Sequence, residues 1–319
     1  MAYFNSLKCK TFLNFICSIL AQLPLTNVQL AYSDDKNVQT NQPTIPEINF
    51  NIISQNSSQK ITINKEFEKN NAQIFQTFDP NFKHLGPEKW TGISWKKILE
   101  LLPKQNEESV TFVAKNQYIC NESVANLNKY GAFLAFQKSG SIVSPTFGGP
   151  IKLMFENQHT AGAYCWYVDT IFRGEPQKPT LRIHNMGTEQ ALTMSALEKL
   201  PSKTITRNFP LPRGHRFSNN IPASNPEIEG ILLTEFVKSR TKPFSKILLK
   251  SEVGRDMILI DAKKTDEIMI AYRVNKKQIP VSWGGPFVAL SLQGNQISSK
   301  LNAQFFLNQI SIEEGESQK

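Results

Sequence analysis

The stretch Ala135–Pro150, AFQKSGSIVSPTFGGP, returns without a gap as AYRVNKKQIPVSWGGP at Ala271–Pro286. Four positions are identical, and an aromatic residue stands directly before Gly-Gly-Pro in both segments. The same offset of 136 residues superimposes VTFVAKNQY, which starts at Val110, on KILLKSEVG, which starts at Lys246. A period this long is typical of a duplicated domain rather than of a solenoid. The sequence therefore predicts two domains with one plan.

Each half also shows the same succession of expected elements. Apolar spacing predicts short helices at Trp95–Leu102 and Leu232–Lys238. Alternating or apolar runs predict strands at Val110–Val113, Gly131–Phe136, Ile151–Phe155, Ile247–Lys250, Ile268–Arg273 and Phe287–Leu292. The fold class is therefore α+β, with two tandem β-rich mixed domains. The proline-containing stretch Arg173–Thr180 is the expected connection between them.

Composition limits the kinds of partner. The 319 residues carry a formal net charge of +9, and every arginine lies at or after Arg173. The lysines are scattered, without a basic stripe interleaved with aromatic residues or a known nucleic-acid motif, so we expect no nucleic-acid partner.

The first residues have the pattern of a secretory signal. Lys8 and Lys10 precede an apolar stretch, Thr11–Leu25, that is too short and too polar to span a bilayer. Small residues at Ala31 and Ser33 favour cleavage before Asp34. We expect residues 1–33 to be a signal peptide and 34–58 a polar linker, followed by domains at 59–176 and 177–319. The mature protein would be periplasmic or secreted, without a transmembrane segment. An N-terminal helix buried in the fold is the alternative.

Five segments of the first half occur in the order of a known family. They are KWTGISWKKILELL (89–102), VTFVAKNQY (110–118), GAFLAF (131–136), FGGPIKLMF (147–155) and WYVDTIF (166–172). The second half keeps MIAYRVNKKQIPVSWGGPFVAL (269–290) and has EGILL (229–233) in place of the tryptophan element. In this order they resemble the sulfite-oxidase-type molybdopterin-binding domain.

That resemblance implies a cysteine that ligates molybdenum in the loop after the first strand. The corresponding segments, 76–87 and 204–220, contain no cysteine. Cys120 and Cys165 lie elsewhere and are expected to be buried apolar side chains or the two halves of a disulfide. The first half also has no arginine before Arg173 to bind a phosphate or an oxyanion, although Lys83, His84 or Lys152 could contribute. We therefore expect no molybdenum chemistry, while molybdopterin remains the cofactor that the resemblance implies.

Two groups of residues are candidates for binding. The resemblance places Gly148, Gly149, Pro150, Gly284, Gly285 and Pro286 near the cofactor, with His159 as the only cation in the segment that follows the first of these turns. The glycines fit a structural turn equally well. Arg207, Arg213, His215 and Arg216 are the local cluster of cations, and they form either an anion site or a solvated surface loop.

Three functions remain open at this point. The first is an exported module that binds a small anionic ligand or a protein partner. The second is a molybdopterin-dependent oxidoreductase with an unusual ligand set, and the third is a cofactor-free enzyme that uses His159 or the loop 207–216. No metal site is predicted, because the four histidines are widely separated in the sequence.

Overall fold

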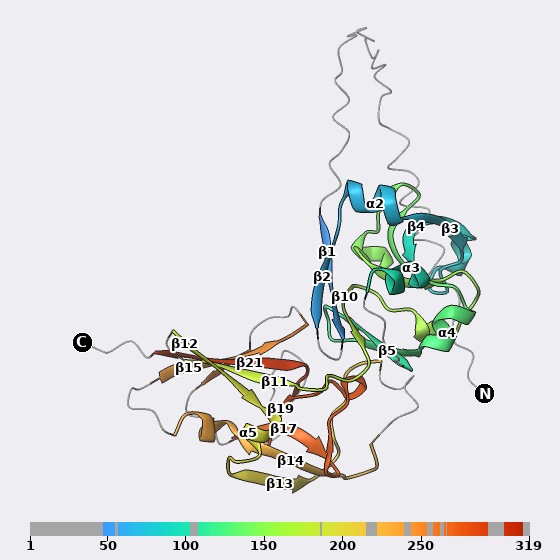
Figure 1. Cartoon of the computed structure of the whole chain (residues 1–319). Helices are drawn as coiled ribbons and strands as arrows, with labels where there is room; N and C mark the ends of the chain where they lie inside the picture. The colour runs from blue at the N-terminus through green and yellow to red at the C-terminus, as the bar shows by residue number, and fades with distance from the viewer. Residues whose placement is uncertain are drawn as a thin grey trace, which may run out of the picture. The chain divides into compact units, whose positions relative to one another are not determined.

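The structure is a computed structural model (Figure 1). It describes residues 47–54, 57–102, 108–185, 187–214, 222–238, 244–253, 258–261, 265, 267–292 and 303–314. These residues belong to one unit, Ile45–Lys319. The expected signal peptide lies outside the described residues.

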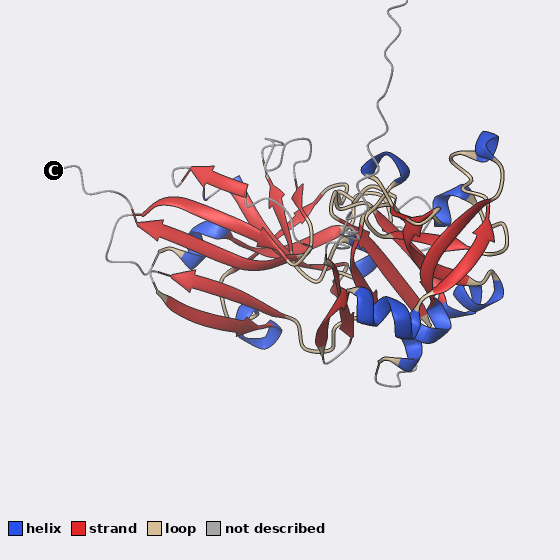
Figure 2. Cartoon of the chain, turned by 90° about the horizontal axis from the view of Figure 1, so that it is seen from above, coloured by secondary structure: helices blue, strands red, loops and turns tan. Residues whose placement is uncertain are grey.

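Strands dominate and helices are short (Figure 2). The longest described helix, α2 (Lys65–Asn71), has seven residues. No helix in the described part is long and apolar enough to cross a membrane. The chain is thus mostly β-sheet with few helices, as the predicted β-rich α+β class requires.

The first half contains ten strands in its described residues. They are β1 Ile48–Ser54, β2 Ser58–Ile63, β3 Gln73–Thr77, β4 Glu88–Ser94, β5 Ser109–Ala114, β6 Ile119–Ser123, β7 Ala132–Lys138, β8 Ser141–Ile142, β9 Lys152–Phe155 and β10 Val168–Arg173. They form two sheets, ordered β2-β1-β10-β5-β6 and β3-β4-β7-β8, and β9 pairs with β7 on the same edge as β8. Helices α3 (Trp95–Glu100) and α4 (Val124–Lys129) each begin after a serine, Ser94 or Ser123, whose hydroxyl accepts a backbone N–H of the first turn.

The second half contains eleven described strands. They are β11 Thr180–Asn185, β12 Thr188–Thr193, β13 Ser202–Thr206, β14 Glu227–Leu232, β15 Phe244–Ser251, β16 Ile258–Asp261, β17 Ile268–Val274, β18 Lys277–Gln278, β19 Val288–Ser291, β20 Ala303–Gln304 and β21 Leu307–Glu314. Their sheets are ordered β12-β11-β21-β15-β16 and β13-β14-β17-β19-β20, with β18 on β17.

The two halves share this strand plan in detail. In each, the first strand pairs in parallel with the last, β1 with β10 and β11 with β21. In each, a register shift occurs at a glycine, Gly92 in β4 and Gly230 in β14, which lies opposite Ala135 or Ala271. A side chain on either glycine would collide with the backbone of the neighbouring strand, within 2.5 Å at Gly92 and 2.6 Å at Gly230.

The Gly-Gly-Pro turns are built alike. Each follows a short 3₁₀ helix, η2 (Pro145–Phe147) or η7 (Val281–Trp283), and each ends in a cis peptide bond to proline. Gly148 and Gly284 have φ of 88° and 87°, which is the left-handed region that favours glycine. The carbonyl of Gly148 accepts the N–H of Tyr167 at 2.7 Å, and that of Gly284 accepts the N–H of Phe306 at 2.6 Å.

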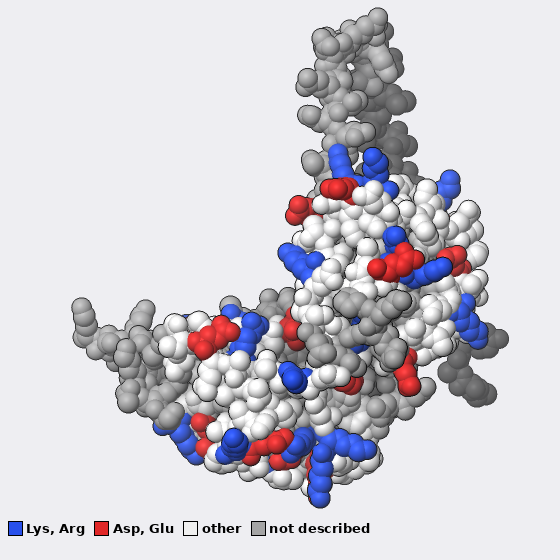
Figure 3. Space-filling model, in the orientation of Figure 1, with Lys and Arg blue, Asp and Glu red and all other residues white. Residues whose placement is uncertain are grey.

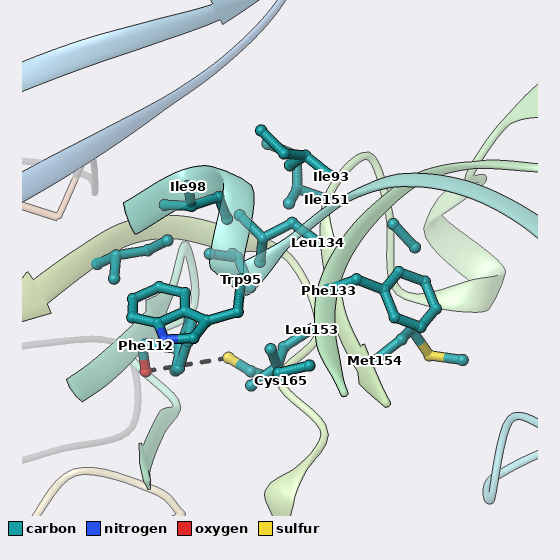
Figure 4. Packing of buried hydrophobic residues seen from close by; sticks show 14 of the residues in the cluster. Ile93, Trp95, Ile98, Phe112, Phe133, Leu134, Ile151, Leu153, Met154 and Cys165 are labelled. Carbon is teal, nitrogen blue, oxygen red and sulfur yellow. Dashed lines mark hydrogen bonds between the residues drawn. The ribbon is translucent and has the colours of Figure 1, made fainter. Parts of the chain in front are cut away.

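The core of the first half lies around α3, β5, β7 and β9. Figure 4 shows Trp95 close to Phe112, and their ring centroids are 5.9 Å apart. Leu134 and Leu153 are fully buried beside them. These strands are buried on both faces along most of their length, which is why their sequences are largely apolar.

A further cluster of buried side chains joins the two halves within this unit. It contains Ile53, Val113 and Phe172 from the first half together with many residues of the second. The rings of Phe172 and Phe306 stack with centroids 5.6 Å apart. The backbone N–H of Ile119 donates to the carbonyl of Arg213 at 2.8 Å.

All six predicted strands are present, and the connection Arg173–Thr180 runs from the end of β10 to the start of β11. Three expectations need correction. Residues 34–58 are not wholly a linker, because β1 lies within them and is largely buried. The first domain therefore begins before residue 59. The predicted helix Leu232–Lys238 is a short 3₁₀ helix, η5 (Leu233–Phe236), instead of an α-helix.

Candidate functional site

A pocket opens in the first half where the turn between β5 and β6 meets the segment that leads into β10. Its volume is about 240 Å³. Its described lining residues are Asn81, Asn116, Tyr118, Ala161, Tyr164, Trp166 and Tyr167. None of these carries a formal charge.

The turn between β5 and β6 positions two lining residues. The N–H of Gln117 donates to the carbonyl of Ala114 at 2.8 Å, and Gln117 has a φ of 59°. The side-chain Oδ1 of Asn116 accepts the N–H of Tyr118 at 3.0 Å, the local bond by which asparagine stabilises turns. The amide Nδ2 of Asn116 makes no hydrogen bond to the described residues.

Tyr167 is fixed by its backbone and by its hydroxyl. Its φ is 57°, and its N–H donates to Gly148. Its hydroxyl donates to the carbonyl of Pro145 at 2.6 Å. The ring is therefore held in one place before any ligand arrives.

Trp166 is seated on the Gly-Gly-Pro turn. A Cβ added to Gly148 would lie 2.5 Å from the indole, so only glycine permits this position. A Cβ added to Gly149 would lie 1.8 Å from the carbonyl oxygen of Val143. Neither glycine lines the pocket. The turn supports the pocket wall from behind, which fits the structural interpretation of these residues.

A buried ion pair lies beneath the aromatic wall. The ammonium of Lys152 donates to Asp79, and both side chains are inaccessible to solvent. Lys152 Nζ is 4.7 Å from the centroid of the Trp166 ring. Burial lowers the pKa of Lys152, and the ion pair with Asp79 opposes that shift. The other carboxylate oxygen of Asp79 accepts the N–H of Asn81 at 3.1 Å. Lys152 and Asp79 thus neutralise each other. Lys152 was a candidate for binding an anion, and its charge is already used in this pair.

His159 does not line the pocket. Its ring stacks on Tyr130 with centroids 4.1 Å apart, and its Nε2 lies 3.3 Å from Glu122 Oε1. Its Nδ1 accepts the N–H of Thr160. Tyr130 thus covers one face of a largely buried ring, and Nε2 is buried beside Glu122 without a hydrogen bond among the described residues.

The cluster of four cations predicted between residues 207 and 216 is only partly described. Arg207 is half-buried, and its Nη1 donates to the carbonyl of Ser291 at 2.9 Å. Arg213 is exposed. His215 and Arg216 lie outside the described residues. The predicted anion site therefore stays a prediction.

Cys120 and Cys165 are free thiols in the core. Cys120 Sγ donates to the carbonyl of Ala163 at 2.9 Å, and Figure 4 shows Cys165 Sγ directed toward the carbonyl of Phe112. Burial raises the pKa of both thiols. Since the thiolate is the form that binds metal, both are poor metal ligands.

Molybdopterin does not fit the described residues of the pocket. The lining offers no thiolate for molybdenum and no cation for the cofactor phosphate. Segment 76–87, where the resemblance places the ligand, contributes Asn81 instead of a cysteine. No group of three or more potential metal ligands occurs among the described residues either.

The second half has the same turn with a different surface. Phe305 and Phe306 stand where the first half has Trp166 and Tyr167, and they are 0% and 1% exposed. Phe305 packs on Gly284, and Phe306 stacks on Phe172. Trp166 and Tyr167 are instead half-buried and line the pocket. One pair of aromatic residues faces a ligand-sized space, while its counterpart is used in packing.

The sequence prediction missed the lining residues of this pocket. One signal could have found two of them. When the two halves are aligned at an offset of 139 residues, Trp166 and Tyr167 correspond to Phe305 and Phe306. Tryptophan and tyrosine carry a polar group on an apolar ring and are typical of half-exposed binding positions.

On the face shown in Figure 3, Lys and Arg side chains are interspersed with Asp and Glu. No patch of a single sign dominates that face.

Comparisons with known proteins give distant likenesses among solved structures. No family model matches the sequence, and no curated protein matches it. Among solved structures, the chain is similar to the crystal structure of the sulfane dehydrogenase SoxCD from Paracoccus pantotrophus, with a TM-score of 0.31 and 10% identity. The match covers 84% of this chain and 78% of that chain.

Proposed function

We propose that this chain is a ligand-binding protein made of two tandem copies of a sulfite-oxidase-type molybdopterin-binding domain, with the binding site in the first copy. The ordered motifs and the repeated strand plan, including matched register shifts and Gly-Gly-Pro turns, support the two copies. The pocket beside Trp166 and Tyr167 supports binding, because its counterpart aromatic residues in the second half are buried. This contrast is the observation that carries the proposal.

The pocket is better suited to binding than to catalysis. Its described lining has no histidine, carboxylate, cysteine or lysine that could act as an acid, base or nucleophile. A molybdopterin oxidoreductase would need a metal ligand and an oxyanion site, and the described residues supply neither there.

A blocking variant tests the proposal. Ala161 is exposed and lines the pocket, so Ala161→Trp should fill it without disturbing the core. Ala125→Trp, on the exposed face of α4, is the matched control. A panel of neutral, anionic and cationic small molecules is titrated into both variants and the parent by calorimetry. Binding that Ala161→Trp abolishes and Ala125→Trp preserves supports the site, and binding unaffected by Ala161→Trp contradicts it.

Metal analysis tests the alternative. Protein from a host that makes the molybdenum cofactor should contain no stoichiometric molybdenum and should not oxidise sulfite. One molybdenum atom per chain would establish the oxidoreductase function instead.

Export is part of the same proposal. It is supported by Lys8, the apolar stretch Thr11–Leu25 and the residues before Asp34. N-terminal sequencing of exported protein should begin close to Asp34, whereas an intact chain from a cytoplasmic fraction would contradict export.

A further inference from the structure

The ligand class can be narrowed further if the pocket is the binding site proposed above. The described lining has no formal charge, and the two charges buried beneath its aromatic wall, Lys152 and Asp79, are paired with each other. An anion entering the pocket would lose water and meet no cationic donor in the described lining. The pocket therefore selects against anionic ligands.

A cation is disfavoured for a different reason. Aromatic rings attract cations, but Trp166 already has the ammonium of Lys152 at 4.7 Å from its centroid. The ring of Phe82 also stacks against Trp166 at 5.9 Å. A ligand cation would have to share the indole with a like charge. The indole therefore disfavours a cationic ligand.

Two amides of the described lining each keep a polar atom that a ligand could use. Asn116 Oδ1 is occupied by the N–H of Tyr118, which leaves Nδ2 as a donor. The Nδ2 of Asn81 points to Asp79, which leaves its Oδ1 as an acceptor. A ligand that satisfies both must offer an acceptor and a donor, and a hydroxyl group can serve as either.

The aromatic walls favour a puckered ring over a flat one. The rings of Trp166 and Tyr167 are inclined at 69°, and both are fixed by the Gly148 turn. A flat heterocycle could lie against only one of them. A sugar ring can place its C–H face on one aromatic ring and its hydroxyl groups toward the amides. The volume of about 240 Å³ is below the roughly 300–1,000 Å³ of sites for drug-sized ligands, so it suits a single ring.

We infer that the pocket binds one uncharged sugar ring. The C–H face of the sugar contacts Trp166 or Tyr167, and its hydroxyl groups form hydrogen bonds with Asn116 Nδ2 and Asn81 Oδ1. Because the walls are fixed in advance, little side-chain ordering opposes binding.

The test uses the full chain and a defined panel. Neutral sugars (glucose, galactose, mannose, xylose, N-acetylglucosamine) are compared with glucuronate, glucosamine and the neutral heterocycles uracil and nicotinamide. Calorimetry gives affinity, and saturation-transfer NMR shows whether ring C–H protons of the sugar contact the aromatic rings. At least one neutral sugar should bind more than 10-fold tighter than its charged analogue.

One substitution isolates the predicted donor. Asn116→Asp keeps Oδ1 for the turn and removes Nδ2, so it should weaken sugar binding about 10-fold. Asn128→Asp makes the same charge change on an exposed position of α4 and should leave affinity unchanged. Equal affinity of Asn116→Asp and the parent would overturn the assignment of the donor.

The outcomes separate this inference from the proposed function. A heterocycle or charged ligand that binds the parent but not Ala161→Trp would overturn the sugar class and leave the binding site in place. If no member of the panel binds, both the sugar class and the proposed function fail.

Discussion

Lys152 places an ammonium group where the first half has no access to water. Replacing Lys152 by methionine would leave the carboxylate of Asp79 buried without a counter-charge, and breaking such a pair costs about 3–5 kcal/mol. We expect urea unfolding to show that Lys152→Met lowers the free energy of unfolding by this amount. Lys97→Met is the control, because its ion pair with Glu100 is exposed and worth about 0–1 kcal/mol. Equal losses in the two variants would contradict the burial of the pair, and adding Asp79→Asn to Lys152→Met should recover part of the loss.

Tyr272 gives the second half a measurable alkaline transition. Burial of its side chain and a 2.9 Å hydrogen bond to Glu229 raise its pKa to about 12, from about 10 in an unfolded chain. The folded state therefore holds this proton more tightly, so the stabilisation is complete below about pH 10 and is lost as the pH rises toward 12. The free energy of unfolding should fall more steeply over that interval in the parent than in Tyr272→Phe. If the free energy of unfolding fell with pH equally in the parent and in Tyr272→Phe, Tyr272 would contribute nothing to this pH dependence.

The pocket shows why single residues were harder to predict than strands. Asn81, Asn116 and Trp166 come from three separate segments, and only the fold brings them together. Lysine at position 152 suggested anion binding, because the sequence does not show that Asp79, 73 residues earlier, pairs with it.

At the scale of elements, the Gly-Gly-Pro turn makes a prediction for each half. A methyl group on Gly149 would lie 1.8 Å from the oxygen of Val143, and one on Gly285 would lie 2.1 Å from that of Ile279. Both glycine-to-alanine variants should lose about 3 kcal/mol or more, since backbone rather than a flexible side chain must move. Gly140→Ala is the control: nothing lies within 4 Å, and its φ of 81° costs only about 1–2 kcal/mol. Thermal unfolding of the three variants should show a larger loss of stability in Gly149→Ala and Gly285→Ala than in Gly140→Ala.

The strands were predicted best where the sequence is apolar and repeated. β7 and β17 are buried along nearly all their length, so they read as apolar runs in both halves. β1 was missed because asparagines alternate with Ile48, Phe50 and Ile52, which gave a polar composition despite a period of two. One of its partners, β10, lies more than 100 residues away, and the other, β2, begins in the polar stretch just after it and was not predicted as a strand either.

At the scale of the whole described unit, the two halves share buried side chains and should unfold together. Phe306 stacks on Phe172 across the halves and is 1% exposed, so Phe306→Ala should cost about 3–5 kcal/mol. Phe78→Ala is the control, because Phe78 is 39% exposed and should cost much less.

Two probes can show whether the halves unfold as one. Three of the four tryptophans, Trp90, Trp95 and Trp166, lie in the first half, so fluorescence reports mainly on that half, whereas circular dichroism reports on the strands of both. In the parent, the two urea transitions should coincide, because a core common to both halves couples them. In Phe306→Ala, the circular dichroism transition should begin at lower urea than the fluorescence transition, since the second half loses the contact that fixes it to β10. Coincident transitions in Phe306→Ala at the parent's midpoint would show that the stacked rings do not hold the halves together.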